Sequence, residues 1–302
     1  MKRNAYFILI VLSVLVLYSF MEGAAKLEVV TSYKYIEDLV RQVGGDRVTV
    51  TALADGQNDP HTVMPKPSFI AKLRRADLFI INGGQLEIGW VPAVLKQANN
   101  PVIMPGNKGF LDLMAFIRPL EIPTSVSRAQ GDVHPEGNPH FHLDPNNIPI
   151  LANAIKEQLC KQDAVNRAVY QSNYESFARK WEEKLKGWNI VFFKLKGVRL
   201  VVYHKLFEYL FTHYHADVIG TIEPLPGIPP SSRHIAGLIE AIKSSNVRLI
   251  IQDGYHSAKT AEFLSNKTGV KWIILPHDIG SIKEVTDLIL LFDEIARRLT
   301  GL

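Results

Sequence analysis

Residues 163–186 read DAVNRAVYQSNYESFARKWEEKLK. Apolar side chains such as Phe177 and Trp181 recur there at three- and four-residue intervals, and no Gly or Pro interrupts them. This spacing predicts one unbroken helix that begins near Ala164, behind an Asp163 cap. At about 1.5 Å per residue, such a helix is a rod of roughly 30 Å, long enough to join two separate lobes.

Both flanks of this rod alternate short apolar runs with stretches of helical spacing. The runs that we expect to be buried strands are residues 27–31, 48–53, 78–82 and 102–104 before the rod, and 200–203, 218–219, 249–252 and 272–275 after it. Alternation of this kind is typical of parallel sheets covered by helices. We therefore expect an α/β protein with two lobes, each with a parallel sheet flanked by helices, joined by a long rigid helix.

These patterns divide the chain into four parts. The first is residues 1–25, followed by an N-terminal lobe over 26–145, connecting helices over 146–187 and a C-terminal lobe over 188–302. Asp144 and Pro145 have the order of a cap and a first helical residue, so we expect the first connecting helix to start there. By the same reasoning, Ser68 is expected to cap the helix that begins at Phe69.

Residues 1–25 have the features of a secretory signal peptide. Lys2 and Arg3 precede an apolar run over 6–20, and small residues lead to a cleavage site near Ala25. The run is shorter than the ~20 residues that a membrane span needs, which disfavours an uncleaved anchor. No cysteine stands at the end of this segment to accept a lipid, and the single thiol, Cys160, excludes an internal disulfide. We expect an unlipidated protein in a periplasm-like compartment.

Composition excludes several classes of protein. The 302 residues are 47% hydrophobic and 21% charged, which is too close to average for a disordered or fibrous chain. The net charge is +4, but Lys and Arg are scattered, so a nucleic-acid partner is not expected. Gly83 and Gly84 follow an expected strand, yet no nucleotide-binding glycine pattern continues from them. No small organic cofactor is expected.

Several histidines stand where an α/β protein can build a site. His204 directly follows one expected strand, His277 and Asp278 follow another, His61 lies in the loop after a third, and His140 ends the first lobe. Ligands of open α/β sheets bind at the carboxyl ends of the strands. We therefore expect His61, His140, His204 and Asp278 to converge in the cleft between the lobes, with His277 as the competitor of Asp278.

Three neutral imidazoles and one carboxylate suit a borderline divalent ion. Zinc is the first choice, and manganese or iron are alternatives. Such a set fills a tetrahedral shell and leaves no vacant position for an activated water, so we expect a metal-binding protein and not an enzyme.

An exported zinc-dependent hydrolase is the alternative interpretation. His140-x-His142-x-Asp144 matches the start of a metallo-hydrolase signature in which an open zinc position generates hydroxide. Pro145 stands where that signature needs a further His, and no His-Glu-x-x-His motif occurs.

Three ordered motifs resemble those of one protein family. They are DPHTVMPKPS (residues 59–68), NPHFHLDP (138–145) and YHKLFEY (203–209). The family is that of the zinc/manganese solute-binding proteins of ABC importers, also called the metal-binding lipoprotein or adhesin family. The resemblance covers nearly the whole mature chain. It implies two α/β lobes bridged by a long helix, and metal ligands at His61, His140 and His204, with a late carboxylate that Asp278 matches.

The resemblance also implies a function and shows departures. A member of this family captures a divalent metal and delivers it to an ABC permease that a separate ATPase powers, and we expect a monomer. His142 occupies a position where the family usually has Trp, which makes it a possible accessory or alternative ligand beside His277. The long His-rich loop of some members is absent, and His134 is at most its remnant, with a transient metal contact.

Overall fold

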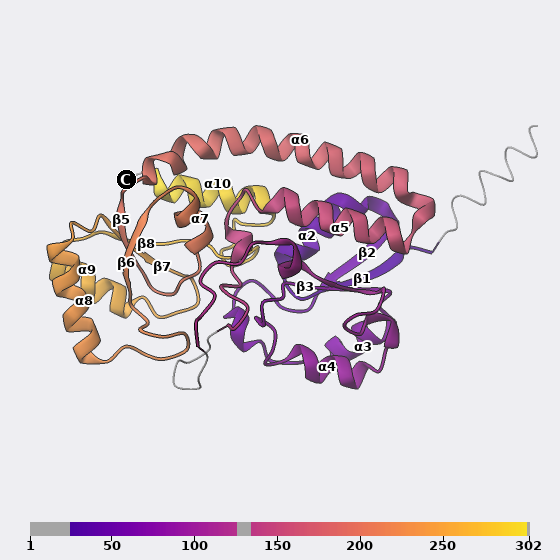
Figure 1. Ribbon diagram of the computed structural model, residues 1–302, viewed down its shortest axis with the longest axis horizontal. Coiled ribbons are helices and arrows are strands. Elements are labelled where there is room, and N and C mark those ends of the chain that lie inside the picture. The colour runs from indigo at the N-terminus through magenta and orange to yellow at the C-terminus, as the bar shows by residue number, and fades with distance from the viewer. Residues whose placement is uncertain (1–24, 126–133, 301–302) are drawn as a thin grey trace, which may run out of the picture.

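Two α/β lobes lie side by side in the computed structural model, which describes residues 25–125 and 134–300 (Figure 1). The expected signal peptide lies outside the described residues apart from its last position. Within the described ranges, no helix has the length and apolar character needed to cross a bilayer.

The first lobe contains a four-stranded, fully parallel sheet in the order β2-β1-β3-β4. Its strands are β1 (Leu27–Thr31), β2 (Val48–Ala52), β3 (Leu78–Ile81) and β4 (Phe110–Asp112). Its helices are α2 (Lys34–Gly44), α3 (Pro67–Arg75), α4 (Val91–Ala98) and α5 (Ile148–Gln162). The central strands are rich in buried Val, Leu, Ile and Phe, as expected for a sheet covered on both faces.

The second lobe repeats this arrangement with the order β6-β5-β7-β8, again fully parallel. Its strands are β5 (Arg199–Val202), β6 (Asp217–Thr221), β7 (Leu249–Gln252) and β8 (Trp272–Ile274). Its helices are α7 (Glu208–His213), α8 (Ser232–Ser244) and α9 (Lys259–Thr268). The α/β class and the two-sheet architecture predicted from the sequence are confirmed.

Helix α6 (Arg167–Phe192) runs along the top of both lobes in Figure 1. Its 26 residues span about 39 Å at 1.5 Å per residue. The buried side chains of α6 lie seven and four residues apart and so form one stripe that faces the protein: Tyr170, Phe177, Trp181, Trp188 and Phe192. The helix begins three residues later than expected because Asp163 caps a short 3-10 turn, Ala164–Asn166, ahead of it.

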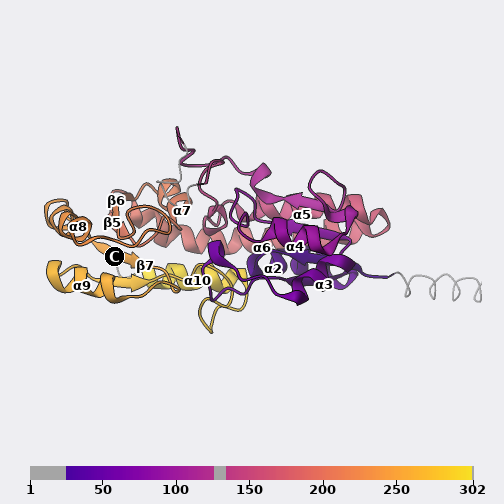
Figure 2. The same ribbon diagram turned by 90° about the horizontal axis from the view of Figure 1, so that it is seen from below.

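A second helix, α10 (Leu288–Leu299), reinforces this bridge. The Phe292 ring packs 5.5 Å from Trp181 and 5.3 Å from Trp188 of α6. At the first residue of α10, the Leu288 amide donates to the carboxylate of Asp38 in α2, at 3.2 Å. Figure 2 shows the two lobes at opposite ends of a long molecule, with α6 and α10 between them. The connection between the lobes is therefore stiff.

The loops of the two lobes also touch. A Cβ atom placed on Gly56, in the loop after β2, would lie 2.0 Å from the Ile279 carbonyl oxygen of the second lobe. Only glycine permits an approach this close.

The fourth strand of the first lobe differs from the expectation. Residues 102–104 were expected to form a strand, but Pro101–Ile103 form a 3-10 turn. The fourth strand is Phe110–Asp112. Pro101 lacks an amide hydrogen for a ladder, and the Asn100 side chain accepts from the Val102 amide, so both residues favour the turn.

Two expected helix starts were also wrong. Helix α3 begins at Pro67, so Ser68 lies inside the first turn and does not cap it. Helix α5 begins at Ile148, because the Asp144 carboxylate accepts from the Asn146 amide at 2.9 Å and closes a turn ahead of the helix.

Candidate metal centre

Three imidazoles meet between the lobes. One nitrogen from each of His61, His140 and His204 lies within 4.8 Å of the other two, and these rings form the only such group of three or more possible ligands among the described residues. The ring centroids are 5.1 to 5.4 Å apart. An ion at the centre of a 4.8 Å triangle lies about 2.8 Å from each corner, against 2.0–2.1 Å for a zinc–nitrogen bond. The rings need to close by less than an ångström to hold zinc.

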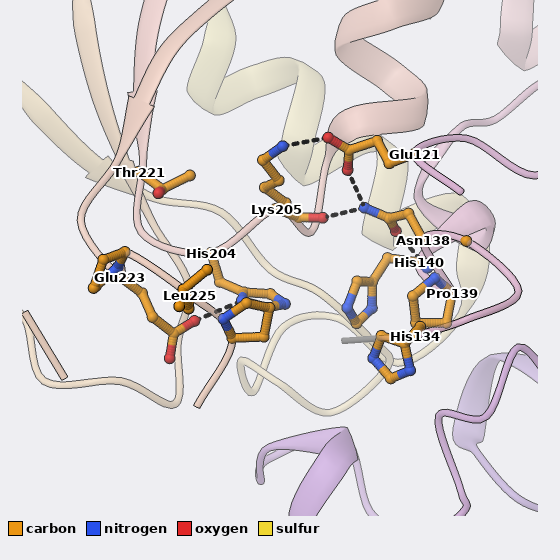
Figure 3. A pocket seen from close by; sticks show the side chains of 13 residues that line it. Glu121, His134, Asn138, Pro139, His140, His204, Lys205, Thr221, Glu223 and Leu225 are labelled. Atoms are coloured by element: carbon orange, nitrogen blue, oxygen red, sulfur yellow. Dashed lines mark hydrogen bonds and ion pairs between the residues drawn. The ribbon is translucent and has the colours of Figure 1, made fainter. Parts of the chain in front are cut away.

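The three rings come from different loops. His61 lies in the 3-10 turn Pro60–Thr62 after β2, His140 precedes another short turn, and His204 follows β5. Figure 3 shows His140 and His204 on facing sides of a cavity of about 260 Å³. Each lobe thus contributes to one site at the carboxyl ends of its strands, where ligands of such sheets bind.

Two carboxylates orient two of the rings. Asp59 Oδ1 lies 2.7 Å from His61 Nδ1, and Glu223 Oε2 lies 2.7 Å from His204 Nδ1. A carboxylate accepts the Nδ1 proton, so the lone pair of the neutral imidazole is left on Nε2. The Nε2 atom of His61 is buried and has no hydrogen-bond partner in the protein. Both rings are therefore held in the tautomer that donates to a metal through Nε2.

His140 is the most buried of the three, with 1% of its surface exposed. Neither of its ring nitrogens has a hydrogen-bond partner. Burial, and then the neighbouring His61 and His204, hold the pKa of His140 well below its usual value, so the ring stays neutral. A buried polar group without a partner is costly, and a bound cation would satisfy it.

Asn138 joins the loops that carry His140 and His204. Its Oδ1 accepts from the His140 amide at 2.9 Å, and its Nδ2 donates to the Lys205 carbonyl at 2.8 Å. The Tyr209 hydroxyl donates to the Asn138 carbonyl at 2.8 Å. These bonds set the spacing of the two histidine loops, one from each lobe.

Asp278 does not join the three histidines. Its carboxylate accepts from the Ile279 amide at 2.7 Å and from the backbone of Lys34 and Tyr35, the first two residues of α2. The first amides of a helix lack partners within the helix and attract a carboxylate, which explains this placement. Burial raises the pKa of Asp278 to about 7. The structure thus departs from the expected four-residue set.

His142 and His277 also lie outside the group. His142 stacks on Tyr35 with centroids 4.2 Å apart, and its Nε2 donates to the His277 carbonyl at 3.0 Å. The His277 ring meets Tyr255 edge-on at 4.8 Å. Both imidazoles belong to the packed interior beside the site.

The side chains of the hydrolase motif do not converge. His140 faces the other two histidines, His142 points toward His277, and the Asp144 carboxylate contacts Asn146 and His213. Within the described chain, this motif therefore provides no shared metal position.

Comparison with known proteins places the chain in a family. The model of the family described as zinc-uptake complex component A, periplasmic (ZnuA), matches residues 29–300. The chain belongs to this family. It is 28% identical to the high-affinity zinc uptake system protein ZnuA of Bacillus subtilis over 264 residues, which cover 87% of this chain and 82% of that protein. It is 24% identical to the zinc-binding lipoprotein AdcA of Streptococcus pneumoniae. That alignment covers 84% of this chain but only 50% of AdcA.

Solved structures of the ZnuA type share the fold. A crystal structure of ZnuA aligns with a TM-score of 0.74 at 23% identity, over 92% of this chain and 99% of that one. The cadmium-bound periplasmic metal-binding protein of Candidatus Liberibacter asiaticus aligns with a TM-score of 0.75 at 21% identity, over 91% and 100% of the two chains. At these identities the likeness shows the two-lobe architecture alone.

Sequence reasoning missed three residues that position the histidines of this family member: Asp59, Asn138 and Glu223. Asp59 stands two residues before His61, within reach of that ring. Glu223 follows β6, the neighbour of the strand that leads to His204. Because the carboxyl ends of adjacent parallel strands meet at one edge, the sheet order would have pointed to Glu223.

Proposed function

We propose that the protein captures a divalent metal ion, with zinc as the favoured cargo, between its two lobes and delivers it to an ABC-type permease. His61, His140 and His204 are the ligands in this proposal. The observation that carries it is the group of three inward-facing imidazoles, two of them oriented by buried or half-buried carboxylates.

The donor set supports zinc. Imidazole nitrogen suits zinc, copper, nickel and iron, whereas manganese favours oxygen ligands. The B. subtilis and S. pneumoniae relatives are named for zinc, while a related periplasmic protein has been solved with cadmium and with manganese. Manganese and iron remain the alternative cargoes.

Family membership supports a transport role and not catalysis. A ZnuA-type protein is the periplasmic component of a zinc-uptake complex. The partner proposed here is the permease subunit of that complex, and the protein is proposed to act as an unlipidated monomer in the periplasm after cleavage near Ala25. Release of the ion then requires the lobes to part, and the double bridge of α6 and α10 limits this to a small movement.

Zinc titration of the mature protein, residues 26–302, tests the proposal. Isothermal titration calorimetry should give one tight site per chain. His204→Ala should abolish tight binding, because it removes one of three nitrogens and leaves Glu223 without its partner. The matched control is His215→Asn, which changes an exposed histidine whose backbone has a φ of 57°, a conformation that Asn tolerates. Equal zinc binding by His204→Ala and the wild type would refute the proposed site.

A further inference from the structure

His134 lies beside the three histidines without belonging to their group. Its ring stacks on that of His61, with centroids 5.2 Å apart and planes inclined by 30°. Together with His140 and His204 it lines the cavity, and Figure 3 shows it next to Pro139 and His140. Its Nε2 atom is buried and has no hydrogen-bond partner, and the Gly84 backbone lies near the ring.

The three histidines leave one position of a tetrahedral zinc shell to be filled. Asp278 is held at the start of α2, outside the group. Asp59 and Glu223 accept hydrogen bonds from the Nδ1 atoms of His61 and His204, on the side of each ring away from Nε2. They orient these two rings and are not candidates for the fourth position. Among the described residues that line the cavity, His134 is the additional imidazole with a free, buried donor atom.

We propose that His134 supplies the fourth ligand, so that the ion is held by four imidazoles. This inference rests on the proposed function and deepens it. His134 begins a turn in which the Gly137 amide donates to the His134 carbonyl at 3.1 Å, and Gly137 has a φ of 103° that favours glycine. This turn places the His134 ring in the lining of the cavity. A shift of the ring toward the three other imidazoles completes the tetrahedral shell of the ion.

A four-imidazole shell has a consequence for the choice of metal. Without an oxygen ligand from the protein, it favours zinc over manganese, which prefers carboxylate, carbonyl and water oxygens. Replacement of His134 by Asp should therefore raise the affinity for manganese relative to zinc, while His134→Ala should weaken zinc binding without this preference.

X-ray absorption at the zinc edge and competition titrations test the inference on the mature protein. Wild type should show four imidazole scatterers, and His134→Ala should show three and one oxygen. Loss of a direct ligand should cost at least the roughly 10- to 100-fold in affinity that outer partners of metal ligands contribute. Asp278→Asn and the surface control His215→Asn should keep four imidazoles and wild-type affinity. Because His134 is only partly buried and lies outside the helices and strands, its replacement should leave the circular dichroism spectrum unchanged.

Different results separate this inference from the proposed function. If the wild type binds zinc through three imidazoles, and His134→Ala binds it equally well, His134 is not a ligand and the inference is wrong while the function stands. If Asp278→Asn loses the affinity and His134→Ala does not, Asp278 is the fourth ligand. If the wild type binds no zinc, both the proposed function and the inference fall.

Discussion

Glu223 Oε2 lies 2.7 Å from Nδ1 of His204, and both side chains are at least nine-tenths buried. The other oxygen of the same carboxylate accepts from the Gly227 amide at 2.8 Å, which fixes its direction. His204 follows β5 and Glu223 follows the neighbouring strand β6. The ligand and the carboxylate that sets its tautomer therefore lie at adjacent strand ends. An imidazole oriented in this way can bind a metal without first reorienting.

Glu223→Gln should weaken zinc binding by about 10- to 100-fold, the usual cost of losing a partner of a metal-bound histidine. The amide that replaces the carboxylate can donate to Nδ1 and so favours the tautomer with its proton on Nε2. Calorimetric titration of the variant measures the loss. Glu240→Gln, on the exposed face of α8, is the control. Unchanged affinity in Glu223→Gln would show that this hydrogen bond does not prepare His204.

His142→Ala should reduce folding stability and leave zinc affinity within about threefold of the wild type. The variant removes the stacking on Tyr35 and the hydrogen bond to the His277 carbonyl, a loss of about 1–3 kcal/mol. Urea denaturation and zinc titration measure the two effects separately. If zinc binding falls as far as in His204→Ala, His142 is a ligand after all.

Zinc binding should release few protons from the site at mildly acidic pH. His140 is already neutral because burial and its histidine neighbours hold its pKa well below the usual value. Because one of the three proposed ligand rings carries no proton to lose, at most two protons can be released from the ligands. Calorimetry at pH 5.5 in buffers of different ionisation enthalpy counts them, and we expect two or fewer. Release of three would mean that His140 is protonated in the free protein.

Glu87→Gln should make the apoprotein more sensitive to acid. Burial raises the pKa of Glu87 to about 7, so between pH 7 and 4.5 the native state binds a proton that the unfolded chain does not, and stability rises as the pH falls. The buried His142 has its pKa lowered to about 4, so between pH 6.5 and 4 the unfolded chain binds the extra proton and stability falls. The two effects oppose each other in the wild type.

Removal of the Glu87 carboxylate should remove up to about 3 kcal/mol of the stabilisation that offsets the histidine effect. Urea denaturation at pH 7.5 and pH 5 should then show a larger loss in Glu87→Gln than in the wild type. Glu262→Gln, an exposed change in α9, is the control. Parallel pH profiles for all three proteins would contradict the assigned pKa of Glu87.

Strands and the long helix could be predicted because their signals are local. β1 and β7 lie at the expected positions, since runs such as LEVVT and LIIQ favour buried strands, and the stripe on α6 follows from its spacing. The fourth strand was not predicted correctly. The apolar residues 102–104 suggested a strand, but Asn100 and Pro101 favour a turn there, and the strand is Phe110–Asp112.

The meeting of the three histidines could be anticipated from strand ends, because parallel sheets bring these ends to one edge. The placement of Asp278 could not be anticipated in this way. Its position after β8 is consistent with the site, but the free amides at the start of α2 compete for its carboxylate, and only the packing of one lobe against the other shows that competition.

Anomalous diffraction at the zinc edge, from crystals of the mature protein grown with one equivalent of zinc, locates the bound ion itself. We expect a single strong peak between the lobes, about 2.0–2.1 Å from Nε2 of His61, Nε2 of His204 and a ring nitrogen of His140. A peak at another position, or the absence of any peak at these three rings, would contradict the proposed metal site.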